Sequence, residues 1–503
     1  MDTPRIRSTA LGRRAFLLTM LTWGGPVCVA AQGFPGGVGD VLGPRFGTGR
    51  RPADLRQRRR RRRPGALESL RHWNEVALDA TGLDHTPTTP GERRVFGEQF
   101  GPGRSSRAMA IVHIAVFDAM NAIIGGYQSY TDPRVAPPAT SIEAAVALAA
   151  HDTLVALFPS QKDELDDILV DDLGTIREGR AKANGITLGR AVAGAILARR
   201  ASDGSQQPEP RVGVDFITSN QPGKWRQDPV SQAPLALGAH WGDLTPFVLR
   251  ASDQFRVPPP PTLDSAEYQH AFNEVKMVGG DGLVTATMRT VEQTFTGLYW
   301  AYDGTPTLCA PPRLYNEIAA HIAEERETRA MEVARLLTLV NVAMADAGIA
   351  IWESKYHYQF WRPVTGIREA GDPTFTPLGA PASNLMGPNF TPPFPAYPSG
   401  HAGFGAALFQ TLRHFYGTDR IAFTFVSDEL NGETVDNHGQ VRPLVARSFS
   451  SLSEAEEENG QSRIYLGIHW AFDKTHGIAQ GRRVADYVFA NAFLRRRGGE
   501  RGA

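Results

Sequence analysis

Residues 104–123 read RSSRAMAIVHIAVFDAMNAI, and this stretch indicates the fold class. Its apolar residues recur at spacings of three and four, which is the period of an α-helix. Several later segments are apolar nearly all round, which indicates helices buried in a large bundle, whereas the alternating patterns of strands are scarce. The predicted helices span 104–124, 140–158, 160–168, 181–201, 265–277, 284–300, 313–325 and 328–361.

Local signals predict where some helices start and where the chain loops. Thr140 and Glu143 have the spacing of a capping box, and Ser160 is placed to open the following helix. Residues 205–262 and 370–397 are rich in Pro, Gly and polar groups and predict long loops. Loops of such length in a compact domain are usually functional or mobile.

Charge and cysteine content exclude some classes of function. The 503 residues allow one to three domains, and 53 basic side chains balance 53 acidic ones. Residues 1–65 hold 14 Arg, no Lys and three Asp, so the remaining chain has a net charge of −11. An acidic body argues against nucleic acid as a partner. Two cysteines, Cys28 and Cys309, do not make a disulfide framework or a thiolate zinc site.

The N-terminal region predicts export. Arg13 and Arg14 precede a short apolar run that ends near Ala31, and this arrangement resembles a twin-arginine signal. We expect a cleavable signal peptide over residues 1–31, a periplasmic or extracellular protein, and no integral membrane segment after cleavage. An uncleaved anchor is the alternative. Residues 32–65 end in six consecutive arginines and predict a disordered linker, with contact to an anionic surface as the alternative.

The first segment with candidate site residues runs from Lys355 to Pro363. Lys355 and Arg362 are seven residues apart, so on a helix they point the same way, and Pro363 should end that helix. Two cations on one face can converge on one anion, although a solvated basic stripe has the same spacing. The aromatic neighbours Tyr356 and Trp361 argue against an open surface.

The second segment is Pro398-Ser399-Gly400-His401, placed where a helix would start. Free amide groups and the positive end of the helix dipole suit an anion there. Ser399 adds a hydroxyl, Gly400 lets the backbone approach closely, and His401 can exchange protons near neutral pH. An ordinary helix start with a buried histidine is the alternative.

The third segment contains Arg463, His469 and Asp473. Arg463 offers a forked donor for oxyanion oxygens, and Asp473 lies one helical turn after His469, where it can orient the imidazole. Arg463 and His469 are six residues apart and do not share a face of one regular helix. A break near Gly467 would let both reach one point; a core histidine with a nearby ion pair is the alternative.

The ordered pattern Lys-x6-Arg-Pro, Pro-Ser-Gly-His and Ser-Arg-x5-His-x3-Asp resembles the signature of vanadium-dependent haloperoxidases and type 2 phosphatidic acid phosphatases. FWRP at 360–363, PFPAYPSGHA at 393–402 and WAYDG at 300–304 resemble the chloroperoxidase branch of the haloperoxidases. The resemblance covers residues 66–503. It implies an all-α fold of two four-helix bundles, an N-terminal bundle over about 66–260 and a catalytic bundle over about 261–503.

The resemblance also implies roles for the candidate residues. His469 would bond to the vanadium of a bound vanadate, His401 would be the acid–base catalyst, and Lys355 would polarise peroxide. Asp303 would contact the site arginines; a plain Asp-Gly turn is its alternative interpretation. The residues expected to hold vanadate are Lys355, Arg362, Ser399, Gly400, Arg463 and His469.

The implied reaction oxidises halide with hydrogen peroxide to hypohalous acid. Phe394 accompanies chloride oxidation in the resembled family, so chloride and bromide are both expected substrates, with Trp361 as a second aromatic of interest. A small organic halogen acceptor and an oligomeric state stay open. The first rival is an acid or lipid phosphatase with His469 as nucleophile. The second is an oxyanion-binding protein, which would not need both histidines.

Overall fold

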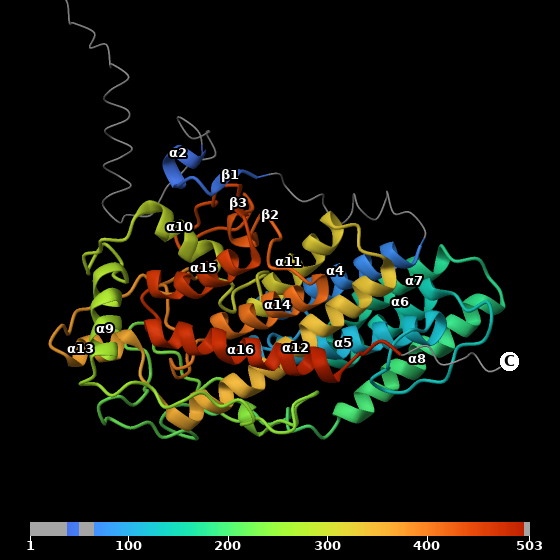
Figure 1. Cartoon of the computed structure of the whole chain (residues 1–503), viewed down its shortest axis with the longest axis horizontal. Coiled ribbons are helices and arrows are strands. Elements are labelled where there is room, and N and C mark those ends of the chain that lie inside the picture. Colours follow the sequence, from blue (N-terminus) through green and yellow to red (C-terminus); the bar gives the residue numbers. More distant parts are fainter. Residues whose placement is uncertain (1–37, 50–64, 497–503) are drawn as a thin grey trace, which may run out of the picture.

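The computed structural model describes residues 38–49 and 65–496, which form fourteen α-helices and one small sheet. The predicted all-α class is confirmed, and the helices make an elongated body (Figure 1). The α-helices are α2 Val38–Leu42, α4 Ala66–Asp84, α5 Gly101–Ile124, α6 Ile142–Leu157, α7 Lys162–Gly174, α8 Arg180–Arg200, α9 Ala266–Val278, α10 Val291–Tyr299, α11 Pro311–Glu325, α12 Ala330–Tyr358, α13 Pro363–Glu369, α14 Gly400–Tyr416, α15 Leu452–Tyr465 and α16 Ala471–Asn491.

Helix α12 is the central element. It packs against α5 on one side and against α14 and α16 on the other, so it joins two groups of helices. Both α5 and α12 are long and apolar enough to cross a membrane, yet their most apolar windows are 89% and 100% buried within the protein. Burial on all sides explains why these two sequences lack a polar face. The predicted boundary between two bundles near residue 260 stays a prediction.

The N-terminal group consists of α4, α5, α6 and α8. Helices α6 and α8 approach closely where α8 carries Gly185 and Gly189. A Cβ on Gly185 would lie 2.5 Å from the backbone oxygen of Ser141, and one on Gly189 would lie 2.6 Å from that of Ala145. The two glycines therefore set the spacing of this pair of helices.

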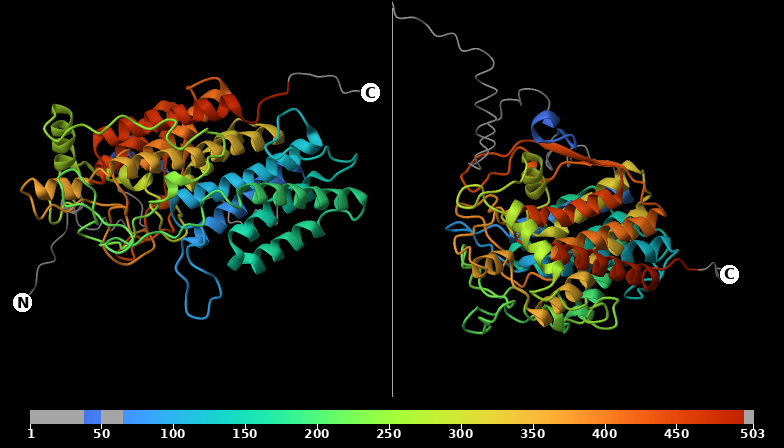
Figure 2. Two further views of the ribbon diagram at one scale, coloured as in Figure 1. Left: turned by 90° about the horizontal axis from the view of Figure 1, so that it is seen from below. Right: turned by 60° about the vertical axis from the view of Figure 1, so that its left-hand side comes forward.

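The same device sets the spacing of α14 and α16 in the C-terminal group. A Cβ on Gly477 would lie 2.7 Å from the oxygen of Ser399, and one on Gly481 would lie 2.1 Å from the oxygen of Gly403. The close approach brings the start of α14 next to the start of α16. Figure 2 shows α12, α14 and α16 running side by side.

A three-stranded antiparallel sheet, in the order β1-β3-β2, corrects one prediction about the N-terminal region. Its strands are β1 Phe46–Thr48, β2 Phe423–Phe425 and β3 Val445–Phe449. The predicted disordered linker over 32–65 is wrong for residues 38–49, because Phe46 is buried against Phe295 and Tyr299 and the backbone pairs with β3. The predicted signal peptide and the arginine run lie outside the described residues.

Several helix boundaries differ from the prediction for local reasons. The helix expected over 328–361 ends at Tyr358, because Gln359 adopts a left-handed conformation with φ 51°. Lys355 and Arg362 therefore do not share a helix. Ser141, not Thr140, caps α6, since its side chain accepts the Ala144 N–H. The helix expected to open at Ser160 begins as a 3₁₀ turn over Pro159–Gln161 and continues as α7. The loops 205–262 and 370–397 are present as predicted, apart from a 3₁₀ turn at Trp241–Asp243.

Candidate functional site

The predicted site residues meet at the ends of six helices, one of which is α13, with Arg362 as its N-cap. Lys355 lies in the last turn of α12, Arg463 lies in the last turn of α15, and Asp303 follows the end of α10. Ser399 and His401 lie at the start of α14, and His469 directly precedes α16. All the predicted site residues are therefore brought to one place, including those from segments more than 150 residues apart.

Lys355 is fully buried and points toward the loop that precedes α14. Its Nζ donates to the carbonyl oxygens of Pro395 and Ala396 at 2.7 and 2.9 Å. It also lies 5.1 Å from the centre of the Phe394 ring. An ammonium group has three protons, so these two bonds leave one proton for a further acceptor.

Arg362 and His469 contact each other directly. Arg362 Nη1 donates to the carbonyl oxygen of Ile468 at 2.8 Å and lies 3.0 Å from His469 Nε2. Arg362 Nε donates to the carbonyl oxygen of Phe394 at 3.0 Å. Because an arginine only donates, His469 Nε2 is the unprotonated ring nitrogen and accepts from Arg362. This tautomer has the Nε2 lone pair that a neutral imidazole uses to bind a metal centre.

Asp473 holds His469 in this orientation. Its Oδ2 accepts from His469 Nδ1 at 2.8 Å and from the Trp470 N–H at 3.0 Å. The chain reaches this position through Gly467, whose φ of 73° ends α15 and redirects the backbone before His469. The predicted break near Gly467 is confirmed, and it allows Arg463 and His469 to reach one pocket.

Arg463 pairs with Asp303 and keeps spare donors. Its Nη2 donates to both carboxylate oxygens of Asp303, at 2.7 and 2.8 Å. Within the described part of the chain, its Nε and Nη1 are buried and have no hydrogen-bond partner. Buried donors without a partner are costly, so the pair of donors marks the place of an absent acceptor.

The start of α14 contributes a hydroxyl and a closely approached backbone. Ser399 is the N-cap and accepts the Ala402 N–H at 3.4 Å, so its hydroxyl proton remains available for donation. A Cβ on Gly400 would lie 3.3 Å from the Trp352 ring, which is a tight contact. Glycine therefore fits best between this helix start and α12.

His401 lies beside the Arg463 and Asp303 pair. Its Nε2 is 2.5 Å from the carbonyl oxygen of Ala301, to which it donates, and 3.8 Å from Asp303 Oδ1. Its own backbone oxygen accepts from Tyr315 Oη at 3.0 Å and from Asn459 Nδ2 at 2.9 Å. The ring of His401 is thus held through Nε2 and its backbone through the carbonyl oxygen, in reach of the pocket cations.

The pocket strongly favours an anion. Burial, followed by the positive charges of Arg362, Lys355 and Arg463, holds the pKa of His469 well below its usual range. Burial also lowers the pKa of Lys355 well below its ordinary value and that of Arg362 to about 9. Three crowded, desolvated cations would be relieved by a multiply charged oxyanion.

The aromatic wall of the pocket differs in part from the prediction. Phe394 is 8% exposed and its ring lies 5.0 Å from the Arg362 guanidinium carbon. The ring beside it is Trp352, with centroids 4.9 Å apart, which sequence reasoning missed. Trp361 instead packs in a separate cluster with Tyr268 and Trp470. The spacing of three between Trp352 and Lys355 on one helix would have placed both on the same face.

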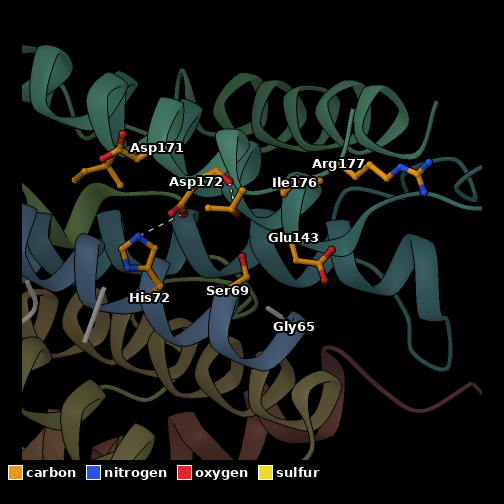
Figure 3. Close-up of a pocket in the computed structure, with 10 residues that line it drawn as sticks. Gly65, Ser69, His72, Glu143, Asp171, Asp172, Ile176 and Arg177 are labelled. Carbon is orange, nitrogen blue, oxygen red and sulfur yellow. Dashed lines mark hydrogen bonds and ion pairs between the residues drawn. The ribbon is translucent and has the colours of Figure 1, made fainter. Parts of the chain in front are cut away.

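A large surface cavity lies elsewhere. A hollow of about 550 Å³ is lined by residues of α4, α6 and α7, where His72 faces Asp172 at 3.4 Å (Figure 3). It contains none of the residues of the predicted site. Volume alone therefore does not identify the reactive centre, whereas converging charges and buried donors do.

Comparisons with known proteins agree with this geometry. Residues 335–497 match a family model described as the VCPO second helical-bundle domain. The chain is 32% identical over 483 residues to the vanadium chloroperoxidase of Curvularia inaequalis, covering 80% of this chain and 78% of that protein.

Solved structures share the fold. The crystal structure of a bacterial vanadium-dependent iodoperoxidase aligns with a TM-score of 0.68 and 24% identity, covering 85% of this chain and 98% of that one. A bacterial vanadium-dependent chloroperoxidase in its holo form aligns with a TM-score of 0.61 and 17% identity, covering 80% and 94%. At these identities the likeness establishes the fold.

Proposed function

The chain belongs to the vanadium chloroperoxidase family, and we propose on that premise that its oxyanion pocket holds the vanadate with which it oxidises halide. The protein is a vanadium-dependent haloperoxidase, an oxidoreductase of the peroxidase class that consumes hydrogen peroxide and halide. The observation that carries the assignment of the pocket is the pair of buried, partnerless donors on Arg463, in a site with two further buried cations.

The donor set fits vanadate. A tetrahedral oxyanion needs several hydrogen-bond donors and positive charges around its oxygens, and one open position at its central atom. Lys355, Arg362, Arg463, the Ser399 hydroxyl and the Gly400 amide supply donors, and the His469 Nε2 lone pair supplies the metal ligand. Asp473 fixes the ring orientation, as outer partners of metal-binding histidines commonly do.

When bound, vanadate supplies Lewis-acid chemistry that makes peroxide an acceptor of halide electrons without a change in the oxidation state of vanadium. The chain's own residues do the rest. His401 moves a proton to or from peroxide at its ring nitrogen, and Lys355 polarises a peroxide oxygen by a hydrogen bond from its third N–H. Asp303 offsets the charge of Arg463 and keeps its guanidinium turned toward the pocket.

We propose that chloride and bromide are both substrates. Phe394 and Trp352 give the pocket an apolar wall against the cations, so a halide that reaches it loses water and meets positive charge. Burial of this wall supports oxidation of chloride, which is more difficult to oxidise than bromide.

The phosphatase alternative shares all of these groups, because phosphate and vanadate have the same shape. The Curvularia inaequalis relative is named a vanadium chloroperoxidase, and its match spans most of both chains. A phosphatase is therefore not favoured, although phosphate should compete for the pocket.

One experiment tests the function. Purified protein is incubated with vanadate, hydrogen peroxide and bromide or chloride, with a dye that reports halogenation, and then with a phosphate ester without vanadate. We expect halogenation that requires vanadate and is inhibited by phosphate. His469→Ala should abolish tight vanadate binding, whereas Arg447→Lys, in a buried ion pair outside the pocket, should keep it. Ester hydrolysis without halogenation would contradict the proposal.

We further propose that the protein is exported by its N-terminal signal. The paired arginines Arg13 and Arg14 and the apolar run behind them support this. Expression of the full chain followed by cell fractionation and mass spectrometry of the mature N-terminus tests it. Retention of residues 1–31 in the cytoplasmic fraction is the contrary result.

A further inference from the structure

The turn after α10 contacts the pocket through two residues, which are separated by one position in the chain. The Ala301 carbonyl oxygen accepts from His401 Nε2 at 2.5 Å, and the Asp303 carboxylate accepts from Arg463 at 2.7 and 2.8 Å. The directions of both groups depend on the backbone of the residue between them, Tyr302. The conformation of Tyr302 therefore sets how the turn presents its acceptors to the pocket.

Tyr302 has a strained backbone. Its φ of 48° lies in the left-handed region, which large side chains rarely adopt and which persists only where surrounding contacts impose it. Its ring is fully buried, and its hydroxyl accepts the Asp428 N–H at 2.6 Å. The following Gly304 is also left-handed, with φ 83°. The turn thus needs an anchor that holds it in place.

Glu429 provides that anchor. Its Oε1 accepts the Tyr302 N–H at 3.0 Å, and its Oε2 accepts from Ser383 Oγ at 2.6 Å. Arg442 forms an ion pair with the same carboxylate and donates to Ser383 Oγ at 2.9 Å. Glu429 and Ser383 are fully buried, and Arg442 is buried too. A charged acceptor with several donors is held far more rigidly than a loop carbonyl.

The residues next to Glu429 in the chain also bind the turn after α10. Glu429 belongs to the 3₁₀ turn Asp428–Leu430, which Ser427 caps. Ser427 Oγ also donates to the carbonyl oxygen of Tyr299 at 2.7 Å, at the end of α10. The turn after α10 is therefore held on both its backbone and its ring by one short segment, 427–429.

We propose that Glu429 is a positioning residue of the active site, which aims Ala301 at His401 and Asp303 at Arg463 by fixing the Tyr302 N–H. The proposal rests on the proposed function of the pocket, and it assigns a specific task to a buried ion pair that touches neither substrate nor vanadate. A purely structural carboxylate would affect stability alone. A positioning carboxylate also affects the hydrogen bond of His401 and the turnover number.

Two substitutions separate the acceptor from its charge. Glu429→Leu removes the acceptor of the Tyr302 N–H, whereas Glu429→Gln keeps an oxygen on that side and loses the ion pair to Arg442. Asp346→Asn is the matched control. Asp346 is a fully buried carboxylate that accepts three backbone N–H groups of residues 247–249 at 2.6 to 2.9 Å, outside the pocket. Ser383→Ala is a milder variant, available if Glu429→Leu does not fold.

The first measurement is independent of activity. Protein with ¹⁵N-labelled histidine, without vanadate, is examined by proton NMR for the hydrogen-bonded ring N–H of His401, assigned by its loss in His401→Ala. We expect Glu429→Leu to shift or broaden this resonance, Glu429→Gln to move it less, and Asp346→Asn to leave it unchanged. Failure of the proposed function would leave this result intact, because no halogenation is involved.

The second measurement is kinetic. We expect kcat to fall about tenfold to a hundredfold in Glu429→Leu, as for a small misplacement of catalytic groups, with partial recovery in Glu429→Gln. Phosphate affinity should fall by a smaller factor, because Lys355 and Arg362 are held by other elements. Ser383→Ala should change kcat and the resonance in the same direction but by less. An unchanged His401 resonance in Glu429→Leu, or an equal loss of kcat in Asp346→Asn, overturns the proposal.

Discussion

Arg463→Lys tests whether the spare donors of Arg463 are what binds the oxyanion. The substitution keeps the positive charge and can keep the ion pair to Asp303, but it removes the planar fork. The guanidinium uses Nη2 for Asp303 and has Nε and Nη1 available for the oxyanion, whereas one ammonium group cannot serve both partners with the same geometry.

The size of the effect follows from the number of bonds lost. A hydrogen bond to a charged group contributes about 1.5–3 kcal/mol, and lysine loses at least one of the two available to the oxyanion. The affinity for phosphate or vanadate should therefore fall about tenfold to a hundredfold. The free energy of unfolding of the anion-free protein should not fall, because the lost donors have no partner there and are costly to bury.

Isothermal titration calorimetry with phosphate measures the affinity, and denaturant unfolding without phosphate measures the stability. Arg447→Lys is the control. Arg447 is a buried arginine that lies outside the pocket and forms an ion pair with Glu458 at 2.6 Å. Phosphate affinity within twofold of the parent protein would refute the assignment of the spare donors. So would an equal loss of affinity in Arg447→Lys.

Two further substitutions test the support of the pocket, and a third tests the packing of β1. Asp473→Asn weakens the acceptor of His469 Nδ1, so we expect vanadate affinity to drop about tenfold to a hundredfold in a vanadate titration of halogenation activity; unchanged affinity would show that Asp473 does not orient the ring. Gly467→Ala places a Cβ 2.4 Å from the Gly279 oxygen at a φ of 73°, so phosphate affinity and thermal stability should both fall; a variant with parental values would mean that the break before His469 tolerates a side chain. Phe46→Ala removes the buried ring of β1, so the free energy of unfolding should fall by about 3 kcal/mol with phosphate affinity unchanged; a stability equal to that of the parent would contradict the packing of β1 on the body.

Local rules of sequence were sufficient for the helices and for the identity of the site groups. The apolar period of 104–124 predicted α5 to within three residues, because a helix buried on all sides keeps its pattern along its whole length. The break at Gly467 was also predictable, since two site residues six apart cannot share a helix face. His401 could be placed at a helix start because a serine N-cap and a glycine precede it.

Predictions failed where distant segments decide the conformation. The separation of Lys355 from Arg362 arises at Gln359, whose left-handed backbone no local pattern marked. Residues 38–49 have the composition of a linker, yet Phe46 packs against Phe295 and Tyr299 of α10 and the backbone pairs with β3. Both outcomes depend on neighbours far away in the sequence.

The sequence by itself determined the helical class, the chemical groups of the pocket and their order along the chain, because periodicity, capping and ligand chemistry act over a few residues. The tertiary structure alone decided that Arg463 keeps two donors free and that Glu429 holds the strained turn at Tyr302. These features arise from contacts between segments more than 40 residues apart. Side-chain hydrogen bonds across such separations are set by tertiary packing, which the local pattern of residues does not predict.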